Sequence, residues 1–441
     1  MSHYKPYPAY RDSGVEWIGK VPEHWKVRPV KHLYNARLGK MVQPQQKSDE
    51  DILVPYHRAQ TVQWERVEYD QVDRMWASSA EIDTYSLNYG DLLICEGGDV
   101  CRAAVFNWTN SETVIFQNSI HRVRPVDGNH PEWLLRLMQH VRSSGWIDVL
   151  CNKNTIVHFT SEKLASLECP HPPPAEQAKI LSTLRNDISR IDALIAKKTR
   201  FIELLKEKRQ ALITHTVTKG LDPDAKMKDS GVEWIGQVPA HWTITRLKYV
   251  SRALIGLTYA PEDVVADGSG VTVLRSLNIQ DGQLDMADIV QVRKVVDTKL
   301  MAQVGDILIC SRNGSRALIG KNIQLDERSL GCTFGAFMTV VRGNFNGYLY
   351  FVFNSTMFDA NSALYMTSTV NQLTISMIEN MEIPLPPETE QTTIVSQLRK
   401  RLMSLDALLS KTQLSIDLLK ERRSALITAA ITGQIDLRDA S

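Results

Sequence analysis

The sequence has 441 residues, of which 43% are hydrophobic and 23% are charged. This length and ordinary composition favour two or three globular domains, and they exclude a disordered tail, a collagen and a small disulfide-stapled protein. The 51 lysine and arginine residues nearly balance the 50 aspartate and glutamate residues, giving a net charge of +1. Net charge therefore neither indicates nor excludes a polyanionic partner.

The apolar runs of the chain are only as long as β-strands. Runs such as 92–95 and 307–310 fall far short of the roughly 20 residues that a bilayer span needs, so no membrane association is predicted. The first residues lack the apolar core and cleavage site of a secretory signal, and the six cysteines are scattered without a CxxC pair. We therefore expect a cytoplasmic protein with reduced cysteines.

A tandem duplication dominates the sequence. Residues 12–25 (DSGVEWIGKVPEHW) and 229–242 (DSGVEWIGQVPAHW) are identical at twelve of fourteen positions. Residues 202–214 and 416–428 are identical at ten of thirteen positions. A period near 215 residues is too long for a solenoid repeat of roughly 20 to 50 residues. The pattern predicts two duplicated domains, each followed by an appendage.

In chain order, the sequence divides into four parts. The predicted parts are a first domain (1–170), a spacer helix (171–220), a second domain with a linker at 221–228 (221–385), and a second spacer helix with a C-terminal tail (386–441). Both domains look mixed α/β, because short β-rich runs alternate with polar turns and a few helical segments. The expected strands include 92–95, 113–116, 271–274, 307–310 and 338–341, and the expected helices are 131–141 and 347–358. Cys95 and Cys310 end matching apolar runs and are expected in the core.

The two spacer segments, expected to be helical over 176–217 and 390–431, share one apolar seam. Its positions keep the 4,3 spacing of a coiled coil over about five heptads. In order they are Leu184, Ile188, Ile191, Ile195, Ile202, Leu205 and Leu212, then Leu398, Leu402, Leu405, Leu409, Ile416, Leu419 and Leu426. Two unrelated amphipathic surface helices would not explain a shared seam. We expect the copies to pair with each other.

Catalytic signatures are absent from the sequence. No GxGxxG, GxxxxGK[ST], GxSxG or HExxH pattern occurs. Asp224-Ala225-Lys226 resembles a nuclease motif but lies in the presumed linker, and Cys169 with His171 has no second chelating pair nearby. No catalytic residue, metal site or cofactor site is therefore predicted in this chain.

Loops that follow the repeated apolar runs carry side chains suited to DNA. Arginine can read guanine bidentately, and asparagine or glutamine can read adenine. The candidate contacts, from equivalent places in both halves, are Arg58, Gln60, Arg102, Arg275, Asn278, Arg312, Asn313 and Arg316. An ordinary solvated role remains open for each. Residues 175–219 and 388–432 together carry a charge of +7, so the rest sums to −6, and charge alone leaves DNA binding undecided.

The repeated motifs together resemble the specificity subunit of type I restriction-modification systems. They are the entry segment at 12–25 and 229–242, GD-LIC at 90–95 and 305–310, the proline–Glu-Gln stretch at 173–184 and 387–398, and LLKE-R-ALIT at 204–214 and 418–428. The resemblance covers essentially the whole chain, with the motifs in the family's order. It implies two target-recognition domains separated by helices that pair as an antiparallel coiled coil.

The resemblance also implies a function. Each domain would read one half of a bipartite, asymmetric site in double-stranded DNA, and the helices would set the gap. The subunit would not be the catalyst. Two modification subunits would bind S-adenosylmethionine and methylate adenine, and restriction subunits would use ATP and magnesium to translocate and cut DNA.

Two readings from other classes remain open. One is a single-chain nuclease with an unrecognised active site, which magnesium-dependent cleavage by the chain alone would support. The other is a coiled-coil adaptor that assembles proteins without touching DNA. The family offers no invariant DNA contact, so the candidate residues rest on chemistry and loop placement.

Overall fold

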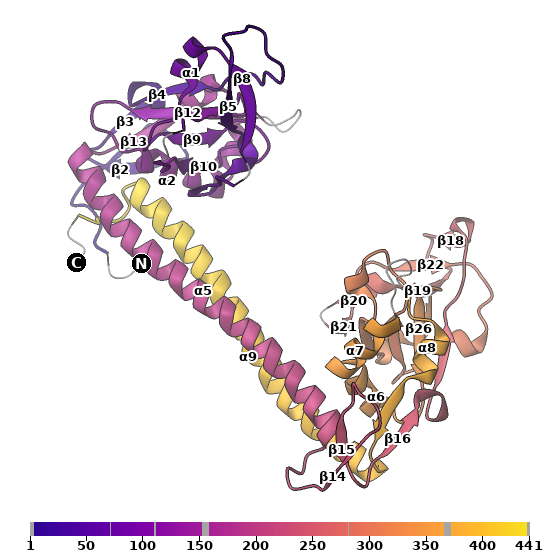
Figure 1. The fold of residues 1–441 in the computed structure, drawn as a ribbon. Helices are drawn as coiled ribbons and strands as arrows, with labels where there is room; N and C mark the ends of the chain where they lie inside the picture. The colour runs from indigo at the N-terminus through magenta and orange to yellow at the C-terminus, as the bar shows by residue number, and fades with distance from the viewer. Residues whose placement is uncertain are drawn as a thin grey trace. The chain divides into compact units, whose positions relative to one another are not determined.

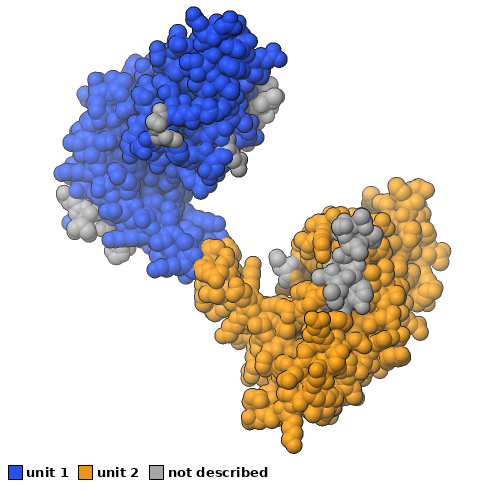
Figure 2. All heavy atoms as spheres, viewed as in Figure 1, with its two compact units in different colours: residues 1–198, 414–441 blue, residues 199–413 orange. Residues whose placement is uncertain are grey.

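The computed structural model describes residues 4–70, 72–109, 112–151, 158–280, 282–365 and 372–438. Contacts divide the chain into two compact units (Figure 2). Unit 1 comprises Met1–Lys198 with Leu414–Ser441, and unit 2 comprises Thr199–Gln413. The predicted boundaries kept each spacer helix whole, whereas the contacts assign part of each helix to each unit. Each unit is therefore one domain with a segment of both helices.

Unit 1 is built mainly from short strands. They are β1 (Tyr10–Asp12), β2 (Lys20–Pro22), β3 (Lys26–Pro29), β4 (Tyr34–Leu38), β5 (Ile52–His57), β6 (Val62–Gln63), β7 (Arg66–Val67), β8 (Asp73–Ala77), β9 (Leu92–Cys95), β10 (Ala103–Val105), β11 (Ile115–Phe116), β12 (Ile120–Pro125) and β13 (Glu168–His171). Its short helices are α1 (Ser79–Tyr85), α2 (Pro131–Ser143), α3 (Trp146–Leu150) and α4 (Ser161–Ser166). The mixed content agrees with the predicted α/β class.

Unit 2 repeats this composition. Its strands are β14 (Met227–Asp229), β15 (Gln237–Pro239), β16 (Thr243–Arg246), β17 (Arg252–Ile255), β18 (Val264–Val265), β19 (Val271–Leu274), β20 (Ile279–Gln280), β21 (Gln283–Leu284), β22 (Val290–Val292), β23 (Ile307–Cys310), β24 (Asn322–Gln324), β25 (Thr333–Phe334), β26 (Met338–Arg342) and β27 (Glu382–Leu385). Its short helices are α6 (Asn346–Phe353), α7 (Thr356–Tyr365) and α8 (Ile375–Asn380). The long helices shared by both units are α5 (Pro174–Lys219) and α9 (Glu388–Ile431).

The larger sheets have corresponding strand orders in the two units, except that β18 adds an edge strand in unit 2. The orders are β10-β9-β12-β4 and β11-β5-β8 in unit 1, and β24-β23-β26-β17 and β25-β19-β22-β18 in unit 2. The parallel pairs, β11 with β5 and β25 with β19, also correspond. Structure thus extends the duplication into the segments whose sequences have diverged, and the chain is two tandem mixed α/β domains.

The predicted elements agree with the structure in most places. The strands expected at 92–95, 271–274 and 307–310 have those bounds, and the helix expected at 131–141 is α2. The single helix predicted over 347–358 is wrong. It is broken between α6 and α7, where Ser355 bonds back to the carbonyl of Val352 at 2.6 Å and a new helix begins at Thr356.

The long helices α5 and α9 lie side by side and antiparallel within each unit (Figure 1). All fourteen predicted seam positions are buried or half-buried. Two arginines that interrupt the seam pair with aspartates of the other helix, Arg423 with Asp192 at 2.9 Å and Arg209 with Asp406 at 3.0 Å. These ion pairs occupy equivalent places in the two copies. The predicted antiparallel pairing is therefore confirmed. At Arg209 and Arg423, where the seam is not apolar, an ion pair joins the two helices.

The aspartate of the repeated GD-LIC motif is buried and ion-paired in each unit. Asp91 and Asp306 are 3% and 2% exposed. Arg124 contacts Asp91 at 2.7 Å, and Arg342 contacts Asp306 at 2.6 Å. The glycine before each aspartate has φ +90°, a conformation that glycine adopts without steric cost. Cys95 and Cys310, which end the motif, are fully buried as predicted.

The entry segment and the first turn of each long helix form one hydrogen-bonded cluster. In unit 1 the carboxylate of Glu176 accepts from Trp25 Nε1 at 3.0 Å and lies 2.9 Å from His24 Nε2. It also accepts from the buried Tyr7 hydroxyl at 3.1 Å. The corresponding cluster of unit 2 consists of His241, Trp242 and Glu390. In each unit, two motifs that lie about 150 residues apart in the sequence thus meet at a single junction between domain and helix.

We expect Glu176→Ala to destabilise unit 1 by about 2–4 kcal/mol, since it leaves the buried Trp25 and Tyr7 donors without this acceptor. Hydrogen exchange of unit 1 amides in the full chain measures the loss. Glu162→Ala is the control, because Glu162 is an exposed carboxylate of the same unit, in the first turn of α4. Equal protection in both variants would contradict a structural role for the cluster.

Candidate nucleic-acid interface

In unit 1 an arginine follows the end of strand β5. Arg58 is extended, with φ −130° and ψ 171°, and precedes a tight turn over Ala59–Thr61. The Thr61 hydroxyl accepts the Arg58 backbone N–H at 3.2 Å and bonds to His57 Nδ1 at 2.9 Å. Burial lowers the pKa of His57 to about 4, so this support is neutral at physiological pH. The Arg58 side chain remains 39% exposed. We call residues 58–61 the arginine turn of unit 1.

Unit 2 has an arginine turn of the same shape at residues 275–278. Arg275 has φ −127° and ψ 176°, and its backbone N–H donates to Asn278 Oδ1 at 2.8 Å. Asn278 is 1% exposed, and its Nδ2 donates to the carbonyls of Asp285 and Asp288. The prediction that Asn278 contacts DNA is not supported, because its amide is buried and committed to holding the turn. Arg275 itself is 28% exposed.

The second predicted loop meets the arginine turn in each unit. In unit 1, Arg102 donates to the Ala59 carbonyl at 2.7 Å and is only 17% exposed. In unit 2, Asn313 Nδ2 contacts Ser276 Oγ at 3.4 Å, at the equivalent place in the turn. The sequence prediction therefore located two loops that the fold brings together. Arg102 is therefore mostly buried and stabilises the turn through its hydrogen bond to Ala59.

The remaining predicted residues lie at the surface. Gln60, Arg312 and Arg316 are exposed. The Arg312 guanidinium lies 5.2 Å from the centre of the Phe337 ring, which orients it by a cation–π contact. These side chains are free to meet a ligand from outside.

The two units differ in the charge of the loop beside the turn. Residues 96–102 include Glu96 and Asp99, and Asp99 pairs with Arg142 at 3.1 Å. Residues 311–316 carry Arg312 and Arg316 and no acid. Matching scaffolds therefore present different chemistry, which suits two different ligand surfaces.

Each turn arginine also contacts an acid that sequence reasoning missed. Arg58 Nη1 lies 3.0 Å from Asp73 Oδ2, and Arg275 Nη2 lies 3.0 Å from Asp288 Oδ1. Both acids lie at or just before the strand that pairs antiparallel with the strand ending at the arginine. Only the strand pairing shows this proximity, since more than ten residues separate each arginine from its acid.

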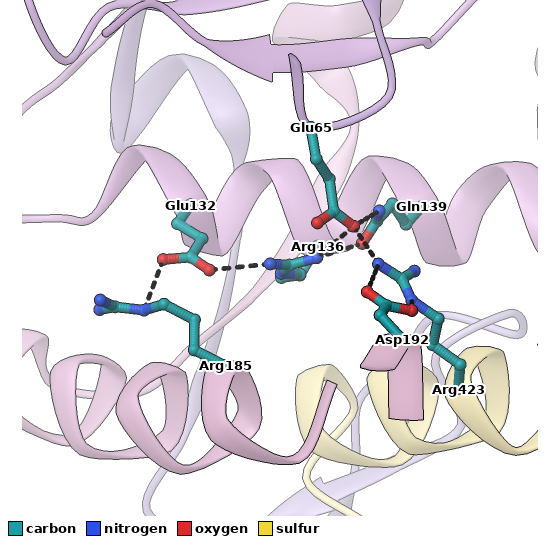
Figure 3. Close-up of polar contacts among 7 residues, drawn as sticks. All are labelled: Glu65, Glu132, Arg136, Gln139, Arg185, Asp192 and Arg423. Carbon is teal, nitrogen blue, oxygen red and sulfur yellow. Dashed lines mark hydrogen bonds and ion pairs between the residues drawn. The ribbon is translucent and has the colours of Figure 1, made fainter. Parts of the chain in front are cut away.

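A polar network connects the first domain to the helices in unit 1 (Figure 3). Glu65, in the hairpin after the arginine turn, contacts Arg136 at 2.7 Å and Arg423 at 2.6 Å. Arg423 in turn contacts Asp192 of α5 at 2.9 Å. Burial opposes ionisation of Glu65, but the arginines outweigh it and hold its pKa below the usual value. The hairpin is thereby held against α2, α5 and α9.

The described residues contain no group of three or more His, Cys, Asp or Glu side chains arranged to hold a metal ion. Cys169 is buried in strand β13, next to His171. Among the described helices, none has both the length and the apolar character needed to cross a bilayer.

Comparison with known proteins identifies relatives of the chain. The family model for the type I restriction modification DNA specificity domain matches residues 22–204 and 285–416. The specificity subunit of type I restriction enzyme EcoKI from Escherichia coli K12 is 28% identical over 207 residues. That alignment covers 45% of this chain and 44% of that subunit, so it spans less than half the relative's length. The putative MjaX specificity subunit of Methanocaldococcus jannaschii is 23% identical over 443 residues, 96% of both chains.

Solved structures share the fold. One, from work on complex assembly and conformational transition of the type I R-M system, matches with a TM-score of 0.74 and 16% identity, covering 94% of this chain and 99% of that chain. The HsdS subunit from Thermoanaerobacter tengcongensis matches with a TM-score of 0.52 and 15% identity over 94% of this chain and 98% of that chain. At these identities the matches establish the architecture alone.

Proposed function

Since the chain belongs to the type I restriction modification DNA specificity domain family, we propose that it reads a bipartite, asymmetric DNA site for a type I restriction-modification complex. Each unit's domain reads one half-site, and the paired helices set the distance between the half-sites. The chain directs adenine-N6 methylation and restriction by partner subunits and performs neither reaction itself.

One observation carries this proposal. The two units share strand order and an arginine turn, yet the side chains around the turn differ. Gln60 of unit 1 corresponds to the exposed Leu277 of unit 2, and Arg102 contacts the turn where Asn313 does in unit 2. A duplicated scaffold with changed contact residues is what reading two unlike half-sites requires, because base edges differ in their donor and acceptor patterns.

The partners we propose are double-stranded DNA, two modification subunits and, in the full complex, restriction subunits. Four leucines outside the helical seam support two equivalent docking sites. They form repeat-matched pairs, Leu194 with Leu408 and Leu204 with Leu418, and all four are exposed. Each unit carries one leucine from each helix. Exposed apolar side chains kept in both copies suit a partner that binds each unit in the same way.

We assign the cofactors to those partners. Methylation needs S-adenosylmethionine, and translocation and cleavage need ATP and magnesium. In this proposal the chain supplies DNA sequence recognition and needs no cofactor. A subunit with this task acts in the cytoplasm, where the DNA of a bacterial or archaeal cell lies.

The test is to co-express the chain with its cognate modification subunit in a methylation-free host and to map N6-methyladenine across the genome. We expect a two-part motif with a fixed gap that disappears when this chain is omitted. A stable complex without methylation would favour a structural adaptor. Magnesium-dependent cleavage by the purified chain alone would favour the nuclease reading.

We expect Arg312→Ala to weaken specific binding, or to relax one base position, by about 1–3 kcal/mol, since Arg312 is exposed beside the arginine turn of unit 2. Fluorescence anisotropy with the assembled complex and single-base variants of the site measures the change. Arg328→Ala is the control, because Arg328 is exposed in the same unit but pairs with Asp326 two residues away. Unchanged affinity and base preference would remove Arg312 from the interface.

A further inference from the structure

We propose that Asp73 and Asp288 are positioning residues that fix the guanidinium groups of Arg58 and Arg275 for base reading. The inference rests on the proposed function and names the side chains that set its specificity. In each unit one Nη nitrogen of the arginine contacts one carboxylate oxygen at 3.0 Å. Within the described part of the chain, these acids are the ion-pair partners of the two turn arginines.

The two acids reach the same arginine from different strand positions. Asp73 is paired with Tyr56, two residues before Arg58. In unit 2 the equivalent pairing joins Val273 to Val290, and Asp288 lies two residues earlier in the chain than Val290. The acids are therefore not the same inherited position. Both units nevertheless place a carboxylate on the turn arginine, which indicates that the arginine needs an acid in either domain.

The backbone around each arginine is already fixed. A capped turn holds residues 58–61 through Thr61 and residues 275–278 through Asn278. Such rigidity leaves only the long arginine side chain to be ordered. A bidentate contact to guanine requires one orientation of the planar guanidinium, and an arginine loses considerable rotamer freedom in adopting it. A carboxylate on one Nη restricts that freedom before DNA arrives.

Exposure separates this role from a stabilising one. Asp73 and Asp288 are 51% and 68% exposed, and ion pairs at such positions contribute little to folding. The arginines are less exposed than the acids, and their Nε atoms are buried. Each arginine side chain is thus more buried than the carboxylate that contacts it. Removing the acid should change how the arginine is oriented without unfolding the domain.

The test uses the complex with its modification subunits and the variants Asp73→Asn and Asp288→Asn. Methylation of DNA libraries randomised in each half-site gives the preference at every base. We expect Asp73→Asn to lower the preference at one position of one half-site by 5- to 50-fold, and Asp288→Asn to do so in the other half-site only. The glutamate variants Asp73→Glu and Asp288→Glu keep a carboxylate and should retain part of the base preference that the asparagine variants lose. Melting temperatures should stay unchanged.

A double-mutant cycle ties each acid to its arginine. Arg58→Ala should relax the same base position as Asp73→Asn, and adding Asp73→Asn to Arg58→Ala should cause no further loss. Asp326→Asn is the matched control, since it breaks an exposed aspartate–arginine pair of unit 2 outside the turn. This variant should leave both half-sites unchanged.

Three outcomes overturn the inference. The first is an unchanged base preference in both asparagine variants, and the second is an equal loss at all positions with a lowered melting temperature. The third is additive effects in the double-mutant cycle. A wild-type complex that yields no bipartite motif would instead refute the proposed function, and the inference would fall with it.

Discussion

Replacing Arg136 with alanine is expected to destabilise unit 1 by about 3–5 kcal/mol, the largest effect of any single substitution in the polar network. The Arg136 side chain is 5% exposed and contacts both Glu65 and Glu132. Its loss removes the buried cation that Glu65 and Glu132 share and leaves each half-buried carboxylate with a single, more exposed arginine. The free energy of unfolding of unit 1, from urea dependence of amide exchange in the full chain, measures the change.

Arg185→Ala is the matched control for Arg136→Ala. Arg185 contacts the same Glu132, at 3.0 Å, but is 58% exposed. Exposed ion pairs contribute about 0–1 kcal/mol, so this variant should remain close to wild type. If both arginine variants destabilised unit 1 equally, the loss of a positive charge, and not the burial of the arginine, would determine how much the network contributes to the free energy of unfolding. If neither variant destabilised unit 1, the network would make no measurable contribution to its stability.

The stability of this network bears on DNA reading. Glu65 lies in the hairpin that follows the arginine turn, and Arg423 and Asp192 lie on the two long helices. A change in Arg136 should therefore loosen the turn of unit 1 as well as its contact with the helices. We expect the half-site read by unit 1 to lose affinity while the other half-site retains it.

Local pattern was sufficient to predict the paired helices. The apolar positions of 184–212 and 398–426 follow one fixed heptad spacing, and a helix can bury such a stripe only against a second helix. The strands at 92–95 and 307–310 were equally predictable, because each is a short apolar run bounded by turn residues. Such features depend on neighbours in sequence.

Long-range partners could not be predicted in this way. Glu176 follows a proline run and reads as the start of a helix, and nothing local shows that it accepts from Trp25 and Tyr7. The acids on Arg58 and Arg275 are likewise visible only once strand pairing is known. Propensity and periodicity carry no information about which distant side chain completes a polar contact.

The candidate site was predicted in part. Sequence chemistry selected loops that the fold brings together, but it could not separate side chains that hold a turn from side chains that face outward. Asn278 is the clearest case, since asparagine suits both adenine and a turn cap. Its burial decides for the cap.

Inserting four residues after Arg200 is expected to change the gap between half-sites, or to disrupt the complex, while leaving the bases of both half-sites unchanged. The insertion lies in α5 close to the boundary between units, after Lys198. It lengthens α5 by about 6 Å and leaves α9 unchanged, so the helices no longer match. Genome-wide N6-methyladenine mapping gives the gap and the bases in one experiment.

A seven-residue insertion in both helices is the matched variant. Adding one heptad after Arg200 and one after Leu414, its repeat equivalent, keeps the apolar seam in phase in both copies. The ion pairs Asp192–Arg423 and Arg209–Asp406 lie on either side of the insertions and remain available. Each helix grows by about 10.5 Å, which corresponds to about three base pairs of duplex. A motif with the same bases and a gap longer by about three is the expected result. Altered bases with an unchanged gap would refute the role of the helices as the spacer. Helix length would then affect which bases are read and not the distance between the half-sites.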